Sequence, residues 1–147
     1  MKSSASLNKA FIDTDVILDF MIAREPFAFD AAHIFSLSEN KEISVCTTGL
    51  VFSNAYYILR KLGTHKKVIE KLTQLARLIE IIGLPKDAVI QALGSDFSDF
   101  EDALQHNAAL AVGVKVIITR NTKDYKNSQL AVLTPDQYLK SRSWVPS

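Results

Sequence analysis

The chain has 147 residues, of which 48% are hydrophobic and 22% are charged, a composition that predicts one globular domain of ordinary size. Its 17 basic and 16 acidic residues leave a net charge of +1, which excludes a highly basic protein that coats nucleic acid. The single cysteine, Cys46, excludes an internal disulfide framework, and no paired histidine or cysteine spacing suggests zinc.

Strand and helix patterns alternate along the chain. Short apolar runs predict strands at 10–12, 43–46, 79–82, 114–119 and 131–133. Apolar residues at helical spacing predict helices at 16–23, 29–37, 50–62, 65–78, 86–93, 99–112 and 134–140. Strands separated by helices pair in parallel through crossover connections. We therefore predict a three-layer α/β/α fold with a central parallel sheet of four to five strands, in one domain over 9–141 with tails at 1–8 and 142–147.

Residues typical of helix ends support these boundaries. Gly63 and Gly113 each follow a predicted helix, the position where glycine most often ends one. Thr134 is expected to cap the last helix, with Pro135 at its first position.

Nothing in the sequence predicts export or membrane insertion. No apolar run approaches the roughly 20 residues that a membrane-spanning helix needs. The first eight residues lack the apolar core of a signal peptide, and the stretch after them contains three aspartates. With the lone cysteine, these features favour a cytoplasmic protein without membrane association.

Acidic residues stand at three places where predicted strands and helices meet. Asp13 follows the first strand, Asp99 and Asp102 begin the helix before the fourth strand, and Asp124 follows that strand. Ligands of parallel sheets bind at the carboxyl ends of the strands, which these segments reach if that helix begins near the same edge. Clustered carboxylates repel and raise one another's pKa unless a hard divalent cation holds them together. The pattern therefore predicts a metal site built from remote parts of the chain.

Each acid also has an ordinary structural explanation. Asp13 can cap the following helix, Asp15 can complement its dipole, and Asp19 is expected on a solvated face. Ser98 and Glu101 match a capping box, and Asp99 with Asp102 nearly matches one.

Capping does not readily explain four acids between residues 96 and 102. On the expected helix, Asp99 and Asp102 share a face and Glu101 points elsewhere.

Polar residues after the fourth strand offer further candidates. Thr119 and Asn121 could orient a metal-bound water, although the segment also reads as an ordinary turn. Arg120 and Lys123 could contact phosphate or lie on the solvated surface. The three histidines have no ligand spacing and are expected at helix surfaces or in packing.

Three segments together resemble a known family. They are F-I-D-T-D-V-I-L-D at 11–19, D-F-E-D-A-L-Q at 99–105 and I-T-R-N-T-K-D-Y at 118–125. Their order and spacing resemble the three acidic blocks of PIN domains, and the size resembles VapC-type toxin ribonucleases of toxin–antitoxin pairs. The resemblance implies a parallel sheet between helices and an endoribonuclease that depends on Mg²⁺ or Mn²⁺.

The resemblance also implies residue roles and partners. Asp13, Asp102 and Asp124 fall on the family's catalytic, metal-binding acids, with Asp99 as an extra acid of this branch. The implied partners are an RNA substrate, a small antitoxin protein and a second copy of the chain in a homodimer. A bound metal would lower the pKa of a water molecule and stabilise charge on the phosphate.

One position departs from the family pattern. The family usually places a glutamate early in the helix after the second strand, but residues 47–60 contain no acid and Asn54 lies nearest the expected place. An amide oxygen can bind a cation but adds no charge, so we expect weaker cation binding. The alternative is a catalytically weak or inactive PIN-like module that binds RNA or protein.

A second alternative comes from another class of enzyme. The run from Asp13 to Asp15 resembles the paired aspartates of haloacid dehalogenase phosphatases. That family requires a small residue and a threonine soon afterwards, where Val16 and Ile17 stand, and a later lysine before an acidic pair has no convincing match. The pattern disfavours this interpretation.

Overall fold

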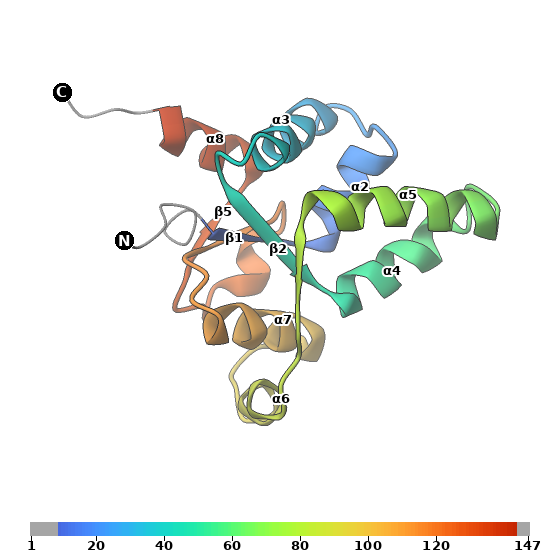
Figure 1. The fold of residues 1–147 in the computed structure, drawn as a ribbon. Coiled ribbons are helices and arrows are strands. Elements are labelled where there is room, and N and C mark those ends of the chain that lie inside the picture. The colour runs from blue at the N-terminus through green and yellow to red at the C-terminus, as the bar shows by residue number, and fades with distance from the viewer. Residues whose placement is uncertain (1–8, 144–147) are drawn as a thin grey trace.

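The computed structural model describes residues 9–143, which form a parallel sheet between two layers of helices (Figure 1). The strands are β1 (Lys9–Ile12), β2 (Ser44–Thr48), β3 (Glu80–Ile82), β4 (Val116–Ile118) and β5 (Ala131–Leu133). Every neighbouring pair is parallel, in the order β3-β2-β1-β4-β5. The predicted α/β/α architecture is confirmed, with five strands.

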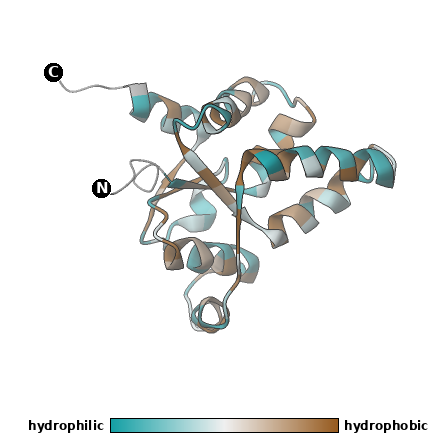
Figure 2. Cartoon of the chain, viewed as in Figure 1, coloured by the Kyte–Doolittle hydropathy of each residue, from teal (hydrophilic) through white to brown (hydrophobic). Residues whose placement is uncertain are grey.

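The central strands β1, β2 and β4 are mostly buried, which explains their apolar sequences, whereas the edge strands β3 and β5 are partly exposed. Phe11 at the centre of the sheet pairs with Cys46 of β2 and Ile117 of β4, and all three side chains are fully buried. Figure 2 shows hydrophobic colour along the central strands and hydrophilic colour over much of the surrounding helices.

Helices cover the two faces of the sheet unequally. They are α2 (Thr14–Met21), α3 (Ala28–Glu39), α4 (Gly49–Leu59), α5 (His65–Leu78), α6 (Lys86–Leu93), α7 (Phe100–Ala111) and α8 (Pro135–Ser143), with a 3₁₀ turn η1 at Thr122–Tyr125. The group of α2, α3, α4, α5 and α8 forms one layer, and α6 and α7 pack together on the other (Figure 1). This arrangement brings α4 and α7 to the same edge of the sheet from opposite faces.

Most predicted helix ends are close to the observed ones, and the largest differences are at the ends of α4 and α8. Gly113 follows α7 with φ of 80°, and Thr134 Oγ1 accepts the N–H of Gln137 at 3.1 Å, so both predicted ends are confirmed. Helix α4 ends at Leu59 rather than at residue 62, and Gly63 does not adopt positive φ. Leu59 is the last buried residue of that helix, so no packing holds a further turn.

The predicted end of the domain at residue 141 falls inside the last helix. Helix α8 continues to Ser143, two residues beyond the predicted end of the domain. The predicted tail at 1–8 and the last four residues of the predicted tail at 142–147 lie outside the described residues. Within the described part of the chain, none of the helices combines the length and hydropathy needed to cross a membrane.

Candidate active site

A cleft lies at the carboxyl ends of β1 and β4, where the order of the strands reverses. Asp13 directly follows β1, and Thr119 directly follows β4. Such switch points are where parallel sheets bind ligands, because the connections leave toward opposite faces. The cavity holds about 550 Å³ and is called the acidic cleft below; its charged and amide side chains are Asp13, Asp15, Arg24, Asn54, Glu101, Asp102, Arg120, Asn121 and Asp124.

Asp13 lies at the base of the acidic cleft and is only 8% exposed. Its Oδ1 accepts the N–H of Thr14 at 2.8 Å, so it also caps α2. Its Oδ2 accepts hydrogen bonds from Thr119 Oγ1 at 3.0 Å and Tyr125 Oη at 3.3 Å. Burial raises the pKa of Asp13, and the charge of Asp124 raises it further against these hydrogen bonds.

Asp102 approaches Asp13 from the first turn of α7. Burial raises the pKa of Asp102 to about 7, with further contributions from the charges of Asp13, Asp99 and Asp124. The hydroxyl of Tyr125 lies 3.4 Å from Asp102 Oδ1, so one buried tyrosine spans the two carboxylates. Sequence reasoning missed Tyr125; its only signal was its place directly after Asp124.

Asp15 also lies in the acidic cleft, although its position in the first turn of α2 could be explained by the helix dipole. Its Oδ2 accepts the Arg120 N–H at 3.0 Å and an Asn121 Nδ2–H at 3.1 Å, and Thr119 Oγ1 lies 3.3 Å away. Its Oδ1 is buried and has no hydrogen-bond partner among the described residues. Burial, and next the charge of Asp13, raise the pKa of Asp15 to about 6. Thr119 and Asn121 therefore hold carboxylates in place.

The remaining acids of the predicted pattern take different positions: one lies at the rim of the cleft, one lies outside it and one lines it. Asp124, in η1, is exposed at the rim. Asp99 does not line the cleft: it caps α7 by accepting the Asp102 N–H at 2.9 Å, so the cap is the second of the two predicted candidates, Asp99 rather than Ser98. Glu101 was expected to point elsewhere, but it lines the cleft together with Asp102. The cleft reaches over to α4, so neighbouring residues of α7 both face it.

The prediction that Asp19 lies on a solvated face is wrong. Its side chain is fully buried beside the cleft, because the arginines after α2 and β4 converge on it. Arg24 Nε lies 3.0 Å from Oδ1, and Arg120 contacts both oxygens, with Nε at 2.7 Å and Nη2 at 3.1 Å. Arg120 also lies over the ring of Phe27, 4.0 Å from its centre. These contacts fix the Arg120 guanidinium at the cleft wall, whereas Lys123 is exposed and does not line it.

The donor set of the acidic cleft suits a hard divalent cation. Its ligands are carboxylate and amide oxygens, as Mg²⁺ and Mn²⁺ prefer. Asp15 Oδ1 has no hydrogen-bond partner among the described residues, and the buried Asp13 and the half-buried Asp15 and Asp102 have raised pKa values, as expected where carboxylates gather to bind a cation. Within 9–143, no three acids, histidines or cysteines already lie close enough to form a metal cluster. Binding would therefore require the carboxylates to turn toward the ion.

The histidines and the cysteine take no part in the cleft. His33 and His65 are exposed on helices, and His106 is buried with its ring 4.9 Å from that of Phe97, as predicted. Cys46 is buried in β2, and burial raises the pKa of its thiol to about 12.

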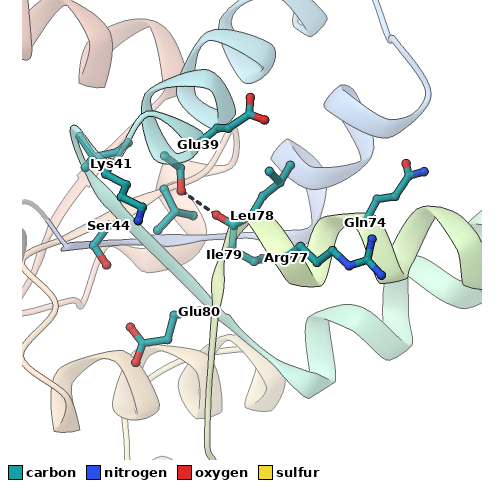
Figure 3. A pocket seen from close by; sticks show the side chains of 11 residues that line it. Glu39, Lys41, Ser44, Gln74, Arg77, Leu78, Ile79 and Glu80 are labelled. Atoms are coloured by element: carbon teal, nitrogen blue, oxygen red, sulfur yellow. Dashed lines mark hydrogen bonds between the residues drawn. The ribbon is translucent and has the colours of Figure 1, made fainter.

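A larger hollow lies at the opposite end of the sheet, where β2 and β3 begin. This amino-end groove holds about 800 Å³ and is lined by Ser38, Glu39, Lys41, Ile43, Ser44, Val45, Gln74, Arg77, Leu78, Ile79 and Glu80. Figure 3 shows its charged side chains spread around the rim rather than meeting at one point. Its one internal side-chain hydrogen bond joins Ser38 Oγ to the Leu78 carbonyl at 2.8 Å. The groove therefore lacks the convergence that marks the acidic cleft.

Comparison with known proteins agrees with this geometry. A family model described as a PIN domain matches residues 9–123, ending one residue before Asp124. Ribonuclease VapC1 of Aquifex aeolicus (strain VF5) is 29% identical over 136 residues, which cover 88% of this chain and 92% of the relative.

Solved structures agree on the fold. A toxin–antitoxin complex from Klebsiella pneumoniae superposes with a TM-score of 0.66 at 18% identity, covering 86% of this chain and 97% of the other. Mycobacterium tuberculosis VapC20, described as a Sarcin-Ricin loop cleaving toxin, superposes with a TM-score of 0.60 at 16% identity, covering 74% and 86%. Since the family model covers most of its length, the chain belongs to the PIN-domain family.

Proposed function

We propose that this protein is a metal-dependent endoribonuclease that hydrolyses RNA phosphodiester bonds, and that it is the toxin of a toxin–antitoxin pair. The observation that carries the proposal is the acidic cleft, where Asp13, Asp15 and Asp102 line one cavity and have pKa values raised by burial and by neighbouring charges. A curated relative is named as a ribonuclease, and family membership supports the same chemistry.

In this proposal, Asp13, Asp102 and Asp124 hold Mg²⁺ or Mn²⁺. The bound ion would lower the pKa of a water molecule and stabilise charge on the phosphate. Thr119 and Tyr125 fix the orientation of Asp13 by donating to its Oδ2. Asp15, held by Arg120 and Asn121, adds negative charge beside Asp13. Asp99 acts as the cap of α7 and through its charge on Asp102 rather than from the cleft wall.

The proposed RNA contacts lie on the cationic side of the cleft. Arg24 and Arg120 both line it, and their ion pairs with the buried Asp19 hold the guanidinium groups in place. A guanidinium fixed in this way suits a phosphate, because it binds in a planar, bidentate geometry. Lys123, exposed next to Asp124, would meet the RNA backbone outside the cleft.

The proposed protein partners follow from the relatives. A solved relative is a toxin–antitoxin complex, and we propose a cognate antitoxin for this chain together with a homodimer in the cytoplasm. Tyr57 and Ile58 line the acidic cleft from α4, and Tyr57 is 68% exposed. An apolar residue of an antitoxin segment would find contacts there beside the acids.

The alternative of an inactive binding module is supported by Asn54. This amide lines the cleft from α4, where the family pattern predicts a glutamate. Such a module would bind RNA or protein equally well with or without a divalent cation. Because the chain belongs to the PIN family, we do not propose the haloacid dehalogenase phosphatase interpretation.

The test is RNA cleavage by purified wild type and Asp102→Asn in the same Mn²⁺ buffer, with and without a chelator. The proposal predicts that the wild type cleaves RNA without chelator but not with it, and that Asp102→Asn does not cleave RNA in either buffer. Asp87→Asn serves as the control, since Asp87 is an exposed acid in the first turn of α6 and does not line the cleft. Equal cleavage by Asp102→Asn would contradict the proposal, and no cleavage by a folded wild type would favour the binding module.

A further inference from the structure

A single hydrogen bond joins α4 to α7 across the acidic cleft. Asn54 Nδ2 donates to Glu101 Oε1 at 2.7 Å, between residues 47 positions apart. Both side chains are half-buried and line the cleft. The bond has a charged acceptor and is short, as expected of a strong, well-oriented contact.

The position of Glu101 makes this contact informative. A glutamate in the first turn of a helix is already favoured by the helix dipole and can remain in solvent. Here it extends toward the amide of α4 instead, and so stays at the wall of the cleft next to Asp102. The amide acts as a donor that holds the carboxylate there.

Only one oxygen of this carboxylate is used by Asn54. Within the described residues, Glu101 Oε2 has no hydrogen-bond partner, and the side chain forms no ion pair. The carboxylate therefore has a free oxygen at a site that already gathers the carboxylates of Asp13 and Asp102. A hard cation would use such an oxygen as a ligand.

We propose that Glu101 is an additional cation-binding carboxylate of the acidic cleft, and that Asn54 is the residue that positions it. The proposal rests on the proposed function, in which a divalent cation binds in this cleft. It implies that α4 contributes no charge of its own but holds a charge that α7 supplies. The cleft thus contains the carboxylate that the sequence pattern lacked at Asn54.

The competing explanation is a purely structural tie between the two helices. The variant Glu101→Gln distinguishes the cation-binding role from this structural role. Glutamine keeps an oxygen that accepts the hydrogen bond from Asn54 but carries no charge. We expect this variant to fold normally and to bind Mn²⁺ about tenfold more weakly in titration calorimetry. Glu70→Gln is the matched control, since Glu70 is exposed on α5 and lies outside the cleft.

An exchange of the two groups tests the pair as a unit. In the double variant Asn54→Asp with Glu101→Gln, the amide lies on α7 and the carboxylate on α4, joined by the reversed hydrogen bond. The negative charge then returns to nearly the same place, so we expect Mn²⁺ affinity to recover to within about threefold of the wild type. Asn54→Ala, which frees Glu101 but keeps its charge, should show an intermediate loss.

The outcomes separate this inference from the proposed function. Wild-type affinity in Glu101→Gln, with binding lost in Asp102→Asn, would overturn the role of Glu101 while the cation site stands. A loss in Glu101→Gln that the double variant does not recover would also overturn it, because the charge would then not be what matters. No Mn²⁺ binding by the folded wild type would overturn both proposals.

Discussion

The parallel sheet has a hollow at each end, and the two differ in how their charged side chains are surrounded. At the amino-end groove, Glu80 is about half exposed and pairs with Lys9 at 2.9 Å. At the acidic cleft, Asp13 is almost fully buried and lies near three other aspartates, whose like charges act on one another. The groove is larger, yet the desolvated like charges are in the cleft. The comparison shows that repulsion among partly buried charges is a better indicator of a functional site than the size of a cavity.

The largest expected effect is a loss of RNA cleavage when the acidic cleft is changed, with no loss when the amino-end groove is changed. Asp13→Asn should reduce Mn²⁺-dependent RNA cleavage at least about 100-fold, since even residues that support a metal ligand cost 10–100-fold. Glu80→Gln, at the amino-end groove, should leave the rate unchanged. Initial rates on a labelled RNA measure both. A similar loss in both variants would mean that the two hollows do not differ in function.

The second effect compares the ion pairs behind the two hollows. Asp19→Asn leaves Arg24 and Arg120 without their buried partner and should lower the free energy of unfolding by about 3 kcal/mol. Lys9→Met removes the partly exposed pair with Glu80 and should cost less than about 1 kcal/mol. Urea denaturation measures both. Equal losses would contradict the view that the buried pair supports the cleft.

The third effect is a pH dependence of stability in metal-free protein. The folded-state pKa of Asp102 is about 7, above its unfolded value of ~4, so the folded state binds the proton more tightly. Stability from this group is therefore full below pH 4 and is lost as the pH rises toward 7. At pH 8, Asp102→Asn should be more stable than the wild type by on the order of 1 kcal/mol, which corresponds to ~3 °C in Tm. Excess Mn²⁺ should stabilise the wild type only.

A control for this effect lies at the other end of the sheet. Glu80→Gln removes a half-exposed carboxylate from the amino-end groove and is the control variant for the same Tm measurements. A Tm of Asp102→Asn at or below that of the wild type at pH 8 would contradict the electrostatic strain assigned to the cleft.

The smallest effect concerns the buried tyrosine. Tyr125→Phe keeps the ring that packs edge-on against Phe97 but removes the hydroxyl between Asp13 and Asp102. One lost hydrogen bond of about 1 kcal/mol corresponds to a fall in cleavage rate of about fivefold. Single-turnover kinetics measure it. An unchanged rate would mean that the hydroxyl does not orient these acids.

The sequence predicted the fold and much of the cleft because both follow from local patterns. Helical spacing and β-branched runs set the elements, and the place of Asp13 and Asp124 after parallel strands put them at one edge of the sheet. The helix end at Gly63 was misplaced because burial, rather than glycine, ends α4 at Leu59.

What the sequence could not predict depends on side chains that meet from remote segments. The sequence predicts Asp19 on the surface, but in the fold Arg120, 101 positions away, donates a hydrogen bond to it. The sequence predicts that Glu101 points away from the face shared by Asp99 and Asp102, but in the fold Asn54 of α4 donates a hydrogen bond to it. Tyr125 had no predicted role, and only the fold brings its hydroxyl to two acids. None of these contacts has a periodic signal, because each depends on how the layers pack.

The most direct test of the central claim, that a divalent cation binds among these carboxylates, is anomalous diffraction from crystals soaked in Mn²⁺. The account predicts a manganese peak within ligand distance of Asp13 and Asp102, with Glu101 turned toward it. An ordered cleft without such a peak, in crystals where manganese is present in the solvent, would contradict it.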